Sequence, residues 1–374
     1  MMNNKKIPVF DIALGEIEKK YIKDCVDTSF IGQGPYVKKL EEKFSSFVNC
    51  KYGITTTSGT TALHLACATI DLKKDDQVLV SSSTNMACPF TIDYCGAIPI
   101  PIDIEKDTWQ MDVSKIEEKI NKKTKAIMVV HLFGHPVDMD PVLKIAKKYN
   151  LKIIEDCAEA HGVEYKGRKV GSIGDIGAFS FFANKTITCG EGGMVTTNSP
   201  ELAEKAKSLK NLAYGKTNKF MHDAIGFNYR LPNISAAMGL GQFENIENVF
   251  KEKERIYKRY TENLKNIKGV KIPAIRSWAT KYIMWVYNLY LDEEFPISRD
   301  ELVKILKDNN IDTRDAFVPI NMQKVLIDKY KLFSENDCPN ANYIMKNGFY
   351  LPSGNTITNE EIDIVCDQIK KVSK

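Results

Sequence analysis

Short apolar runs alternate with amphipathic segments from about residue 52 to residue 200. Several of these runs are apolar at every position, which is typical of strands that are buried under helices on both faces. Strands are predicted at 52–57, 77–82, 97–103, 125–132, 151–156, 177–182 and 192–198. Helical patterns separate several of them, for example at 58–70 and 140–150. Alternating strands and helices of this kind predict an α/β fold with a parallel sheet.

The pattern changes after about residue 233. A helical stretch over 233–264 begins with small residues and then becomes highly charged, which predicts a solvated connecting helix. Beyond residue 270 a strand is expected within 282–292, and helices are expected at 298–311 and 359–372. The chain is therefore predicted to form a large domain over residues 1–250 and a smaller one over residues 251–374.

Composition excludes several classes of function. The 374 residues are 43% hydrophobic and 27% charged, with a net charge of +4 and no basic tract interleaved with aromatic residues, so nucleic acid is not an expected partner. No apolar run reaches the length of a membrane span, and the segment "MMNNKKIPVFD" lacks the apolar core of a signal peptide. The nine cysteines include no C-x-x-C pair, which indicates reduced thiols and a cytoplasmic location.

Histidines give no clear metal site. His131 and His135 are four residues apart in "HLFGHPVDMD". This segment reads as a loop at the end of a strand rather than a helix face, so no metal is expected there.

Polar residues at strand ends carry the predicted chemistry, because ligands of parallel sheets bind beyond the carboxyl ends of strands. Asp156 ends the run "LKIIED"; it either caps the next helix or faces a cationic ligand group such as a protonated pyridine nitrogen. The stretch Ser58-Gly59-Thr60-Thr61 precedes a helical pattern. It is either an ordinary helix cap or a phosphate site built on free backbone N–H groups.

Lys185 follows the run "GAFSFF" and comes 29 residues after Asp156. Taken alone it could be a solvated loop lysine. A phosphate site, a carboxylate and a lysine on adjacent strand ends together indicate a pocket for pyridoxal 5′-phosphate. In that pocket Lys185 would bind the cofactor covalently and move a proton, while Asp156 would keep the ring nitrogen protonated.

Three blocks resemble the DegT/DnrJ/EryC1/StrS family of aminotransferases: "EDCAEAHG", "GAFSFFANKTITCGEGGMV" and "GFNYRLPNISAAMGLGQFE". The resemblance extends over essentially the whole chain. It implies the type I fold of pyridoxal phosphate enzymes, with a mostly parallel sheet in the large domain, a smaller C-terminal α+β domain, and a homodimer with shared active sites. Within the family the chain is most similar to the branch that aminates C4 of nucleotide-linked 4-keto-6-deoxy sugars.

The resemblance also assigns residues. Lys185 falls on the cofactor-binding lysine and Asp156 on the ring-nitrogen carboxylate. Further positions match the residue near the ring hydroxyl (Glu159), the phosphate-binding serine and turn (Ser180, Ser58, Gly59, Thr60), an asparagine that reaches the neighbouring subunit's cofactor (Asn228) and a residue near the substrate (His161).

Two departures from the family pattern concern the substrate. The block "SSSTNMACPF" puts Asn85 where the family usually has an aromatic residue that stacks on the cofactor. Either Asn85, with Met86, covers the ring, or the cofactor sits differently. The small-domain block "TRDAFVPINMQKVL" also differs from the pattern of the sugar-aminating branch.

The expected reaction is amino transfer from L-glutamate to a ketone, most simply C4 of a nucleotide-linked 4-keto-6-deoxy hexose used for surface polysaccharide. An alternative acceptor is a small phosphorylated ketone such as dihydroxyacetone phosphate, whose phosphate Arg230 or Arg314 would bind. A third interpretation is a non-catalytic relative that binds the cofactor or a sugar, although such a protein has no need of Lys185.

Overall fold

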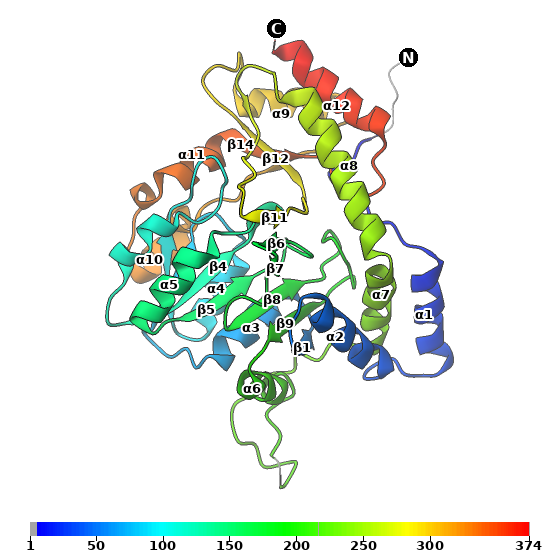
Figure 1. Cartoon of the computed structure of the whole chain (residues 1–374), viewed down its shortest axis with the longest axis vertical. Helices are drawn as coiled ribbons and strands as arrows, with labels where there is room; N and C mark the ends of the chain where they lie inside the picture. Colours follow the sequence, from blue (N-terminus) through cyan, green and yellow to red (C-terminus); the bar gives the residue numbers. More distant parts are fainter. Residues whose placement is uncertain (1–5, 216, 374) are drawn as a thin grey trace.

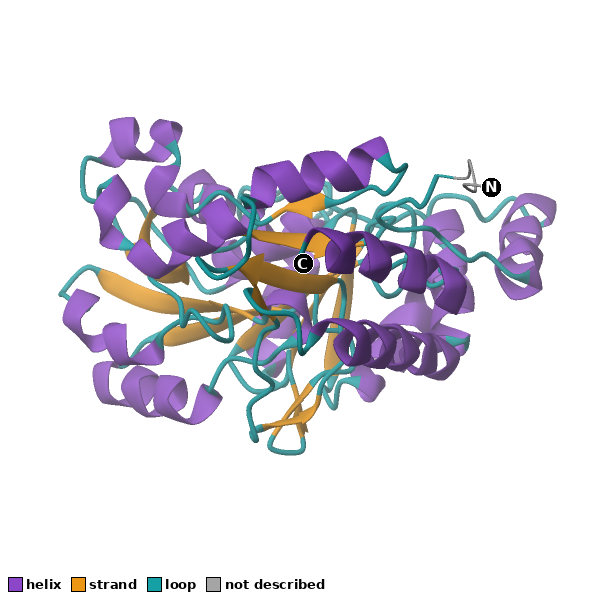
Figure 2. Cartoon of the chain, turned by 90° about the horizontal axis from the view of Figure 1, so that it is seen from above, coloured by secondary structure: helices purple, strands orange, loops and turns teal. Residues whose placement is uncertain are grey.

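The computed structural model describes residues 6–215 and 217–373. Its central sheet has seven strands, all of them predicted from the apolar runs (Figure 2). In spatial order they are β3 (Ile98–Ile102), β2 (Gln77–Ser81), β4 (Thr124–Val130), β5 (Lys152–Asp156), β8 (Ile176–Ser180), β9 (Gly193–Thr197) and β1 (Tyr52–Thr56). β9 is antiparallel to β8 and β1, and the other neighbouring pairs are parallel. The predicted α/β fold with a mostly parallel sheet is confirmed.

Both faces of the sheet are covered by helices, which explains the unbroken apolar runs. In β4, Ala126 and Met128 pack on one face, and Ile127 and Val129 pack on the other, because successive side chains of a strand point in opposite directions. The first face is covered by α3 (Gly59–Thr69), α4 (Ala87–Tyr94) and α6 (Pro200–Lys210). The second face is covered by α2 (Pro35–Phe47), α5 (Met139–Tyr149) and α7 (Asn233–Glu244), and α1 (Glu16–Asp27) packs on α7.

The prediction of a solvated helix after α7 is wrong. α8 (Ile246–Leu264) begins after a break at Asn245 and connects the two parts of the molecule (Figure 1). It buries Val249, Ile256, Tyr260 and Leu264, which recur at the spacing of one helix face. The many charged residues lie between these positions and concealed the stripe in the sequence.

The C-terminal part has a second core. Its antiparallel sheet has the order β10 (Val270–Lys271), β12 (Tyr287–Leu291), β14 (Gly348–Leu351) and β13 (Arg314–Asp315). β12, α9 (Arg299–Asp308) and α12 (Asn359–Val372) confirm the elements predicted there, and α10 (Lys324–Tyr330) and α11 (Pro339–Asn347) complete the helices. Ile7 forms a bridge to Ile311 and packs in this core. The N-terminal segment thus associates with the C-terminal part, and the boundary at residue 250 stays a prediction.

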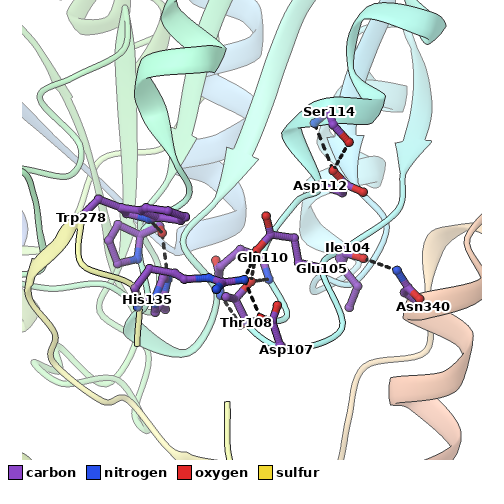
Figure 3. Close-up of polar contacts among 12 residues, drawn as sticks. Ile104, Glu105, Asp107, Thr108, Gln110, Asp112, Ser114, His135, Trp278 and Asn340 are labelled. Atoms are coloured by element: carbon purple, nitrogen blue, oxygen red, sulfur yellow. Dashed lines mark hydrogen bonds and ion pairs between the residues drawn. The ribbon is translucent and has the colours of Figure 1, made fainter. Parts of the chain in front are cut away.

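Polar contacts join the C-terminal part to the segments that follow β3 and β4 (Figure 3). A small sheet of β11 (Ala279–Lys281), β6 (Glu164–Tyr165) and β7 (Arg168–Lys169) lies beside them. The Arg276 guanidinium lies 2.5 Å from Asp107. The backbone N–H of Arg276 donates to His135 Nε2 at 3.1 Å, so Nδ1 carries the proton and donates to the Pro136 carbonyl at 2.9 Å. Burial lowers the pKa of His135 to about 4, and the ring is a neutral linker at physiological pH.

All nine cysteines are free thiols, and eight of them are buried. Among residues 6–215 and 217–373, no helix is both long and apolar enough to cross a membrane.

Replacement of Gly134 by alanine should lower the free energy of unfolding by about 3 kcal/mol or more. Gly134 has φ +88°, and a Cβ atom there would lie 1.9 Å from the Ile283 carbonyl oxygen. Urea denaturation followed by circular dichroism measures the loss.

Gly167 provides the matched control for Gly134. It has φ +77°, but a Cβ atom would meet nothing within 4 Å. Gly167→Ala should therefore cost only the left-handed backbone strain of about 1 kcal/mol. Equal losses in the two variants would show that the close approach to Ile283 does not matter.

Candidate active site

A cavity of about 540 Å³ lies at the carboxyl ends of the parallel strands. The last residues of β4, β5 and β8 (Val130, Asp156 and Ser180) all line it. This is the edge of the sheet where ligands of parallel sheets bind. Its polar lining includes most of the predicted site residues, namely Ser58, Gly59, Thr60, Asn85, Asp156, Glu159, Ser180 and Lys185.

The N-terminus of α3 forms a cradle that fits a phosphate. Ser58 is the N-cap, and its hydroxyl accepts from the Thr61 N–H at 3.1 Å. The N–H groups of Gly59 and Thr60 lie in the first helical turn, where the helix supplies them no acceptor, and both residues line the cavity. The Ser180 hydroxyl accepts from the Phe182 N–H at 3.3 Å, which leaves its proton free to donate. Backbone donors, a hydroxyl and the helix dipole together suit an anion.

Gly59→Ala should lower the affinity for pyridoxal 5′-phosphate about tenfold, because an added Cβ would lie 2.6 Å from Ser180 Cβ and push this serine away. Absorbance titration of the apoprotein with the cofactor measures the change. Gly32→Ala is the control, since a Cβ there meets nothing within 4 Å. Unchanged affinity in Gly59→Ala would remove Ser180 from the cradle.

Asp156 ends β5 and presents its carboxylate to the cavity while only 5% exposed. One oxygen accepts from the Ala158 N–H at 2.9 Å, and the other accepts from the Cys88 thiol at 2.9 Å. The bond to Ala158 closes a turn and caps no helix. Such a fixed, desolvated carboxylate favours a positively charged partner, as its predicted role beside a protonated ring nitrogen requires.

Glu159 is the second buried acid of the cavity. Its carboxylate accepts from the Phe133 backbone N–H at 3.0 Å and lies 3.3 Å from Lys185 Nζ. Burial raises the pKa of Glu159, and the nearby ammonium of Lys185 opposes this effect. Phe133 presents its N–H from a left-handed conformation with φ 54°, which is strained for a bulky residue.

Lys185 lies in the loop after β8 with its side chain 11% exposed. Besides Glu159, its Nζ contacts the face of Trp285, at 3.8 Å from the ring centroid. Lys185 is therefore not a solvated surface lysine.

Asn85 lines the cavity at the position expected to cover the ring, but its side-chain oxygen accepts from the Ala87 N–H at 2.9 Å. Met86 does not line the cavity and packs on the core cluster that contains the buried residues of α3. The cavity wall at Asn85 is thus polar and small, and the role of Asn85 as a cover for the ring stays a prediction.

His161 and Asn228 do not line this cavity. His161 is 1% exposed and packs against Phe44, Phe179 and Phe181. Burial and the nearby charge of Lys185 lower its pKa to about 3, so the ring is neutral, and a role near the substrate stays a prediction. Asn228 is exposed and accepts from Arg230 Nε at 2.9 Å, a placement open to a neighbouring subunit.

Neither arginine proposed for a substrate phosphate lines the cavity. Arg230 is held by Asn228. Arg314 is exposed on β13 and lies opposite Tyr350, which does line the cavity.

Four aromatic residues of the cavity were not predicted as site residues: Phe182, which follows β8, and a C-terminal set of Trp285, Phe317 and Tyr350. The ring of Phe133 stacks between Trp285 and Phe317. No motif marks the C-terminal set, and only the aromatic richness of 282–290 offered a signal.

A group of potential metal ligands, His131, Glu155 and Cys157, lies on the other side of β5. Its atoms are already engaged. His131 accepts from the Val137 N–H and contacts Glu155 at 3.1 Å, and the Glu155 carboxylate accepts three backbone N–H groups from the turn 171–174. Burial opposes ionisation, but these hydrogen bonds lower the pKa of Glu155. The group therefore fastens this turn to the sheet.

Comparisons with known proteins agree with this geometry. The model of the DegT/DnrJ/EryC1/StrS aminotransferase family matches residues 13–370. GDP-perosamine synthase of Escherichia coli O157:H7 is 39% identical over 98% of both chains, and that of Vibrio cholerae is 36% identical over 97% of this chain and 98% of its own. The structure of S. venezuelae DesV in complex with a ketimine intermediate superimposes with a TM-score of 0.92 and 27% identity over 99% of both chains. The cradle, Asp156 and Lys185 fit pyridoxal 5′-phosphate, and the chain belongs to the DegT/DnrJ/EryC1/StrS family of pyridoxal phosphate-dependent aminotransferases.

Proposed function

We propose that this aminotransferase moves the amino group of L-glutamate to C4 of a GDP-linked 4-keto-6-deoxy hexose, for the synthesis of a surface polysaccharide. The observation that carries the proposal is the cavity, in which a phosphate cradle, Asp156 and Lys185 surround one space. The full-length similarity to two GDP-perosamine synthases supports the choice of acceptor.

The cavity residues have separate roles in this proposal. When bound, pyridoxal 5′-phosphate supplies an aldehyde that condenses with amines and a ring that accepts electrons. The N–H groups of Gly59 and Thr60 and the Ser180 hydroxyl would hold its phosphate. Asp156 would keep the ring nitrogen protonated, and Glu159 would serve the side of the ring that carries the hydroxyl. Lys185 would hold the cofactor covalently and, when its amine is free, would accept a proton from the amino acid and return it.

A small phosphorylated ketone is not favoured as the acceptor. Among the described lining residues Lys185 is the one basic side chain, whereas Asp156, Glu159 and Glu191 are acidic. The phosphate of a small ketone would lie close to its keto carbon, inside this cavity, and would meet repulsion there. The diphosphate of a GDP sugar is attached at C1, across the hexose ring from C4. The aromatic side chains of Trp285, Phe317 and Tyr350 instead offer apolar surface to a deoxy sugar.

A homodimer with shared active sites, working in the cytoplasm, is part of the same proposal. Phe220, Met221 and Ile225 are 78%, 66% and 90% exposed on a loop that projects beyond α6 (Figure 1). Exposed apolar side chains of this kind favour contact with another chain. Asn228 follows the loop and is exposed outside its own cavity, and we propose that it faces the site of a second copy. The free thiols fit a reducing compartment.

Mass spectrometry of reaction products tests the function. The purified protein is incubated with L-glutamate, pyridoxal 5′-phosphate and GDP-4-keto-6-deoxymannose; parallel reactions contain a dTDP-linked 4-keto-6-deoxy sugar or dihydroxyacetone phosphate. An amino sugar from the GDP substrate, formed faster than the other products, supports the proposal. No product from the GDP sugar would overturn the choice of acceptor.

A further inference from the structure

Lys185 has an unusual second neighbour in the cavity wall. Its Nζ lies 3.8 Å from the centroid of the Trp285 ring and 3.3 Å from Glu159 Oε1. Lys185 is 11% exposed and Trp285 is 4% exposed, so little water is left to solvate the ammonium. An indole face attracts a cation most strongly when both are desolvated.

Trp285 is fixed by three independent contacts. Its indole Nε1–H donates to the Asn184 carbonyl at 2.7 Å, which ties the ring to the residue that precedes Lys185. Its own carbonyl accepts from the buried ammonium of Lys253 at 2.9 Å. Its ring stacks on Phe133 at 6.0 Å between centroids and 17° between planes, and Phe133 is also the residue whose N–H orients Glu159. The indole face and the Glu159 carboxylate are thus both held against Lys185 Nζ.

We propose that Trp285 is a positioning residue for Lys185. Whenever the amine of Lys185 is free from the cofactor, the Trp285 face and the Glu159 carboxylate hold its ammonium at the edge of the cavity. A lysine side chain has four flexible bonds, and an unpaired ammonium in an apolar site is costly. Trp285 and Glu159 stabilise the charge of the ammonium and limit the conformations of the Lys185 side chain. This inference rests on the proposed role of Lys185.

The first test uses the apoprotein and tryptophan fluorescence. Lys185→Met removes the cation beside the ring, so it should change the emission of the apoprotein. The same substitution should change nothing in a Trp285→Phe background, in which Trp109 and Trp278 remain. The contact would be overturned if Lys185→Met left the emission of the native background unchanged, or if it changed the emission equally in both backgrounds.

The second test separates positioning from folding. Trp285→Leu removes the ring face, and should slow the half-reaction with L-glutamate about tenfold. It should also raise the isotope effect of α-deuterated glutamate, because proton transfer by a poorly held amine becomes slower. Trp285→Phe, which keeps a ring face, should lose less. Pyridoxamine phosphate binds without a bond to Lys185, so its affinity should stay within about twofold. If Trp285→Leu lost as much affinity for pyridoxamine phosphate as it lost in rate, or if the isotope effect stayed unchanged, the role of Trp285 would be merely structural.

The outcome is distinguishable from failure of the proposed function. If Lys185→Ala still bound pyridoxal 5′-phosphate covalently in this cavity, the role of Lys185 would be wrong, whatever the fluorescence shows. If Lys185→Ala loses the covalent bond, but the effect of Lys185→Met on fluorescence does not depend on Trp285, only the proposed contact between Lys185 and Trp285 is wrong.

Discussion

Lys185→Ala is expected to lower the rate of amino transfer from L-glutamate about 10⁴-fold or more. The variant loses both the covalent bond to the cofactor and the group that moves the proton. The fold should persist, since the side chain lies in a cavity wall and makes one ion pair, to Glu159. The visible spectrum of the protein with pyridoxal 5′-phosphate, followed before and after addition of L-glutamate, measures both losses.

Lys210→Ala is the matched control. Lys210 is 14% exposed and lies 2.8 Å from Glu41, so its burial and pairing resemble those of Lys185, but it does not line the cavity. Its loss should lower stability and leave the cofactor spectrum and the turnover unchanged. Multiple turnover by Lys185→Ala would contradict the assigned role, and loss of turnover in both variants would point to a general defect.

The sheet was predictable because its strands are short, apolar on both faces and separated by helical patterns. The same reasoning failed for α8. Its stripe of Val249, Ile256, Tyr260 and Leu264 is narrow, and the charged residues between them dominate the composition of the segment. Burial of this stripe depends on the C-terminal core, whose contacts join residues far apart in sequence.

Cavity residues that lie at the end of a strand, or shortly after it, were predictable from the sequence. Ser58, Asp156, Ser180 and Lys185 come directly after or at the ends of strands that the topology brings together. Trp285, Phe317 and Tyr350 were not predictable, since their place in the wall depends on how the C-terminal part packs on the sheet.

The surroundings of His161 were not predictable from its motif. The motif suggested a position near the substrate, whereas the ring does not line the cavity and packs against Phe44, Phe179 and Phe181. Motif position indicates proximity along the chain, whereas the side of a sheet on which a residue lies depends on the turn that follows the strand.

Asp156→Asn should lower the rate of the half-reaction with L-glutamate about 10²- to 10³-fold and weaken cofactor binding. An asparagine keeps the shape and can still accept from the Ala158 N–H. It carries no negative charge, so the ring nitrogen loses the partner that keeps it protonated and the ring accepts electrons less readily. Stopped-flow absorbance measures the rate, and titration of the apoprotein measures the affinity.

Asp103→Asn is the control for the loss of a buried carboxylate. Asp103 is 2% exposed, lies 3.2 Å from Lys115 and accepts from the Ala341 N–H at 2.9 Å, away from the cavity lining. This variant should lose stability, because the buried carboxylate of Asp103 loses its charge and its partly exposed partner Lys115 is left unpaired, while the cofactor spectrum and the half-reaction stay as in the native protein. If Asp156→Asn reacted at the native rate, the carboxylate would not face the ring nitrogen, and the cofactor would have to lie in the cavity in another orientation. If both variants lost the half-reaction equally, the effect would come from destabilisation of the sheet and not from the charge of Asp156.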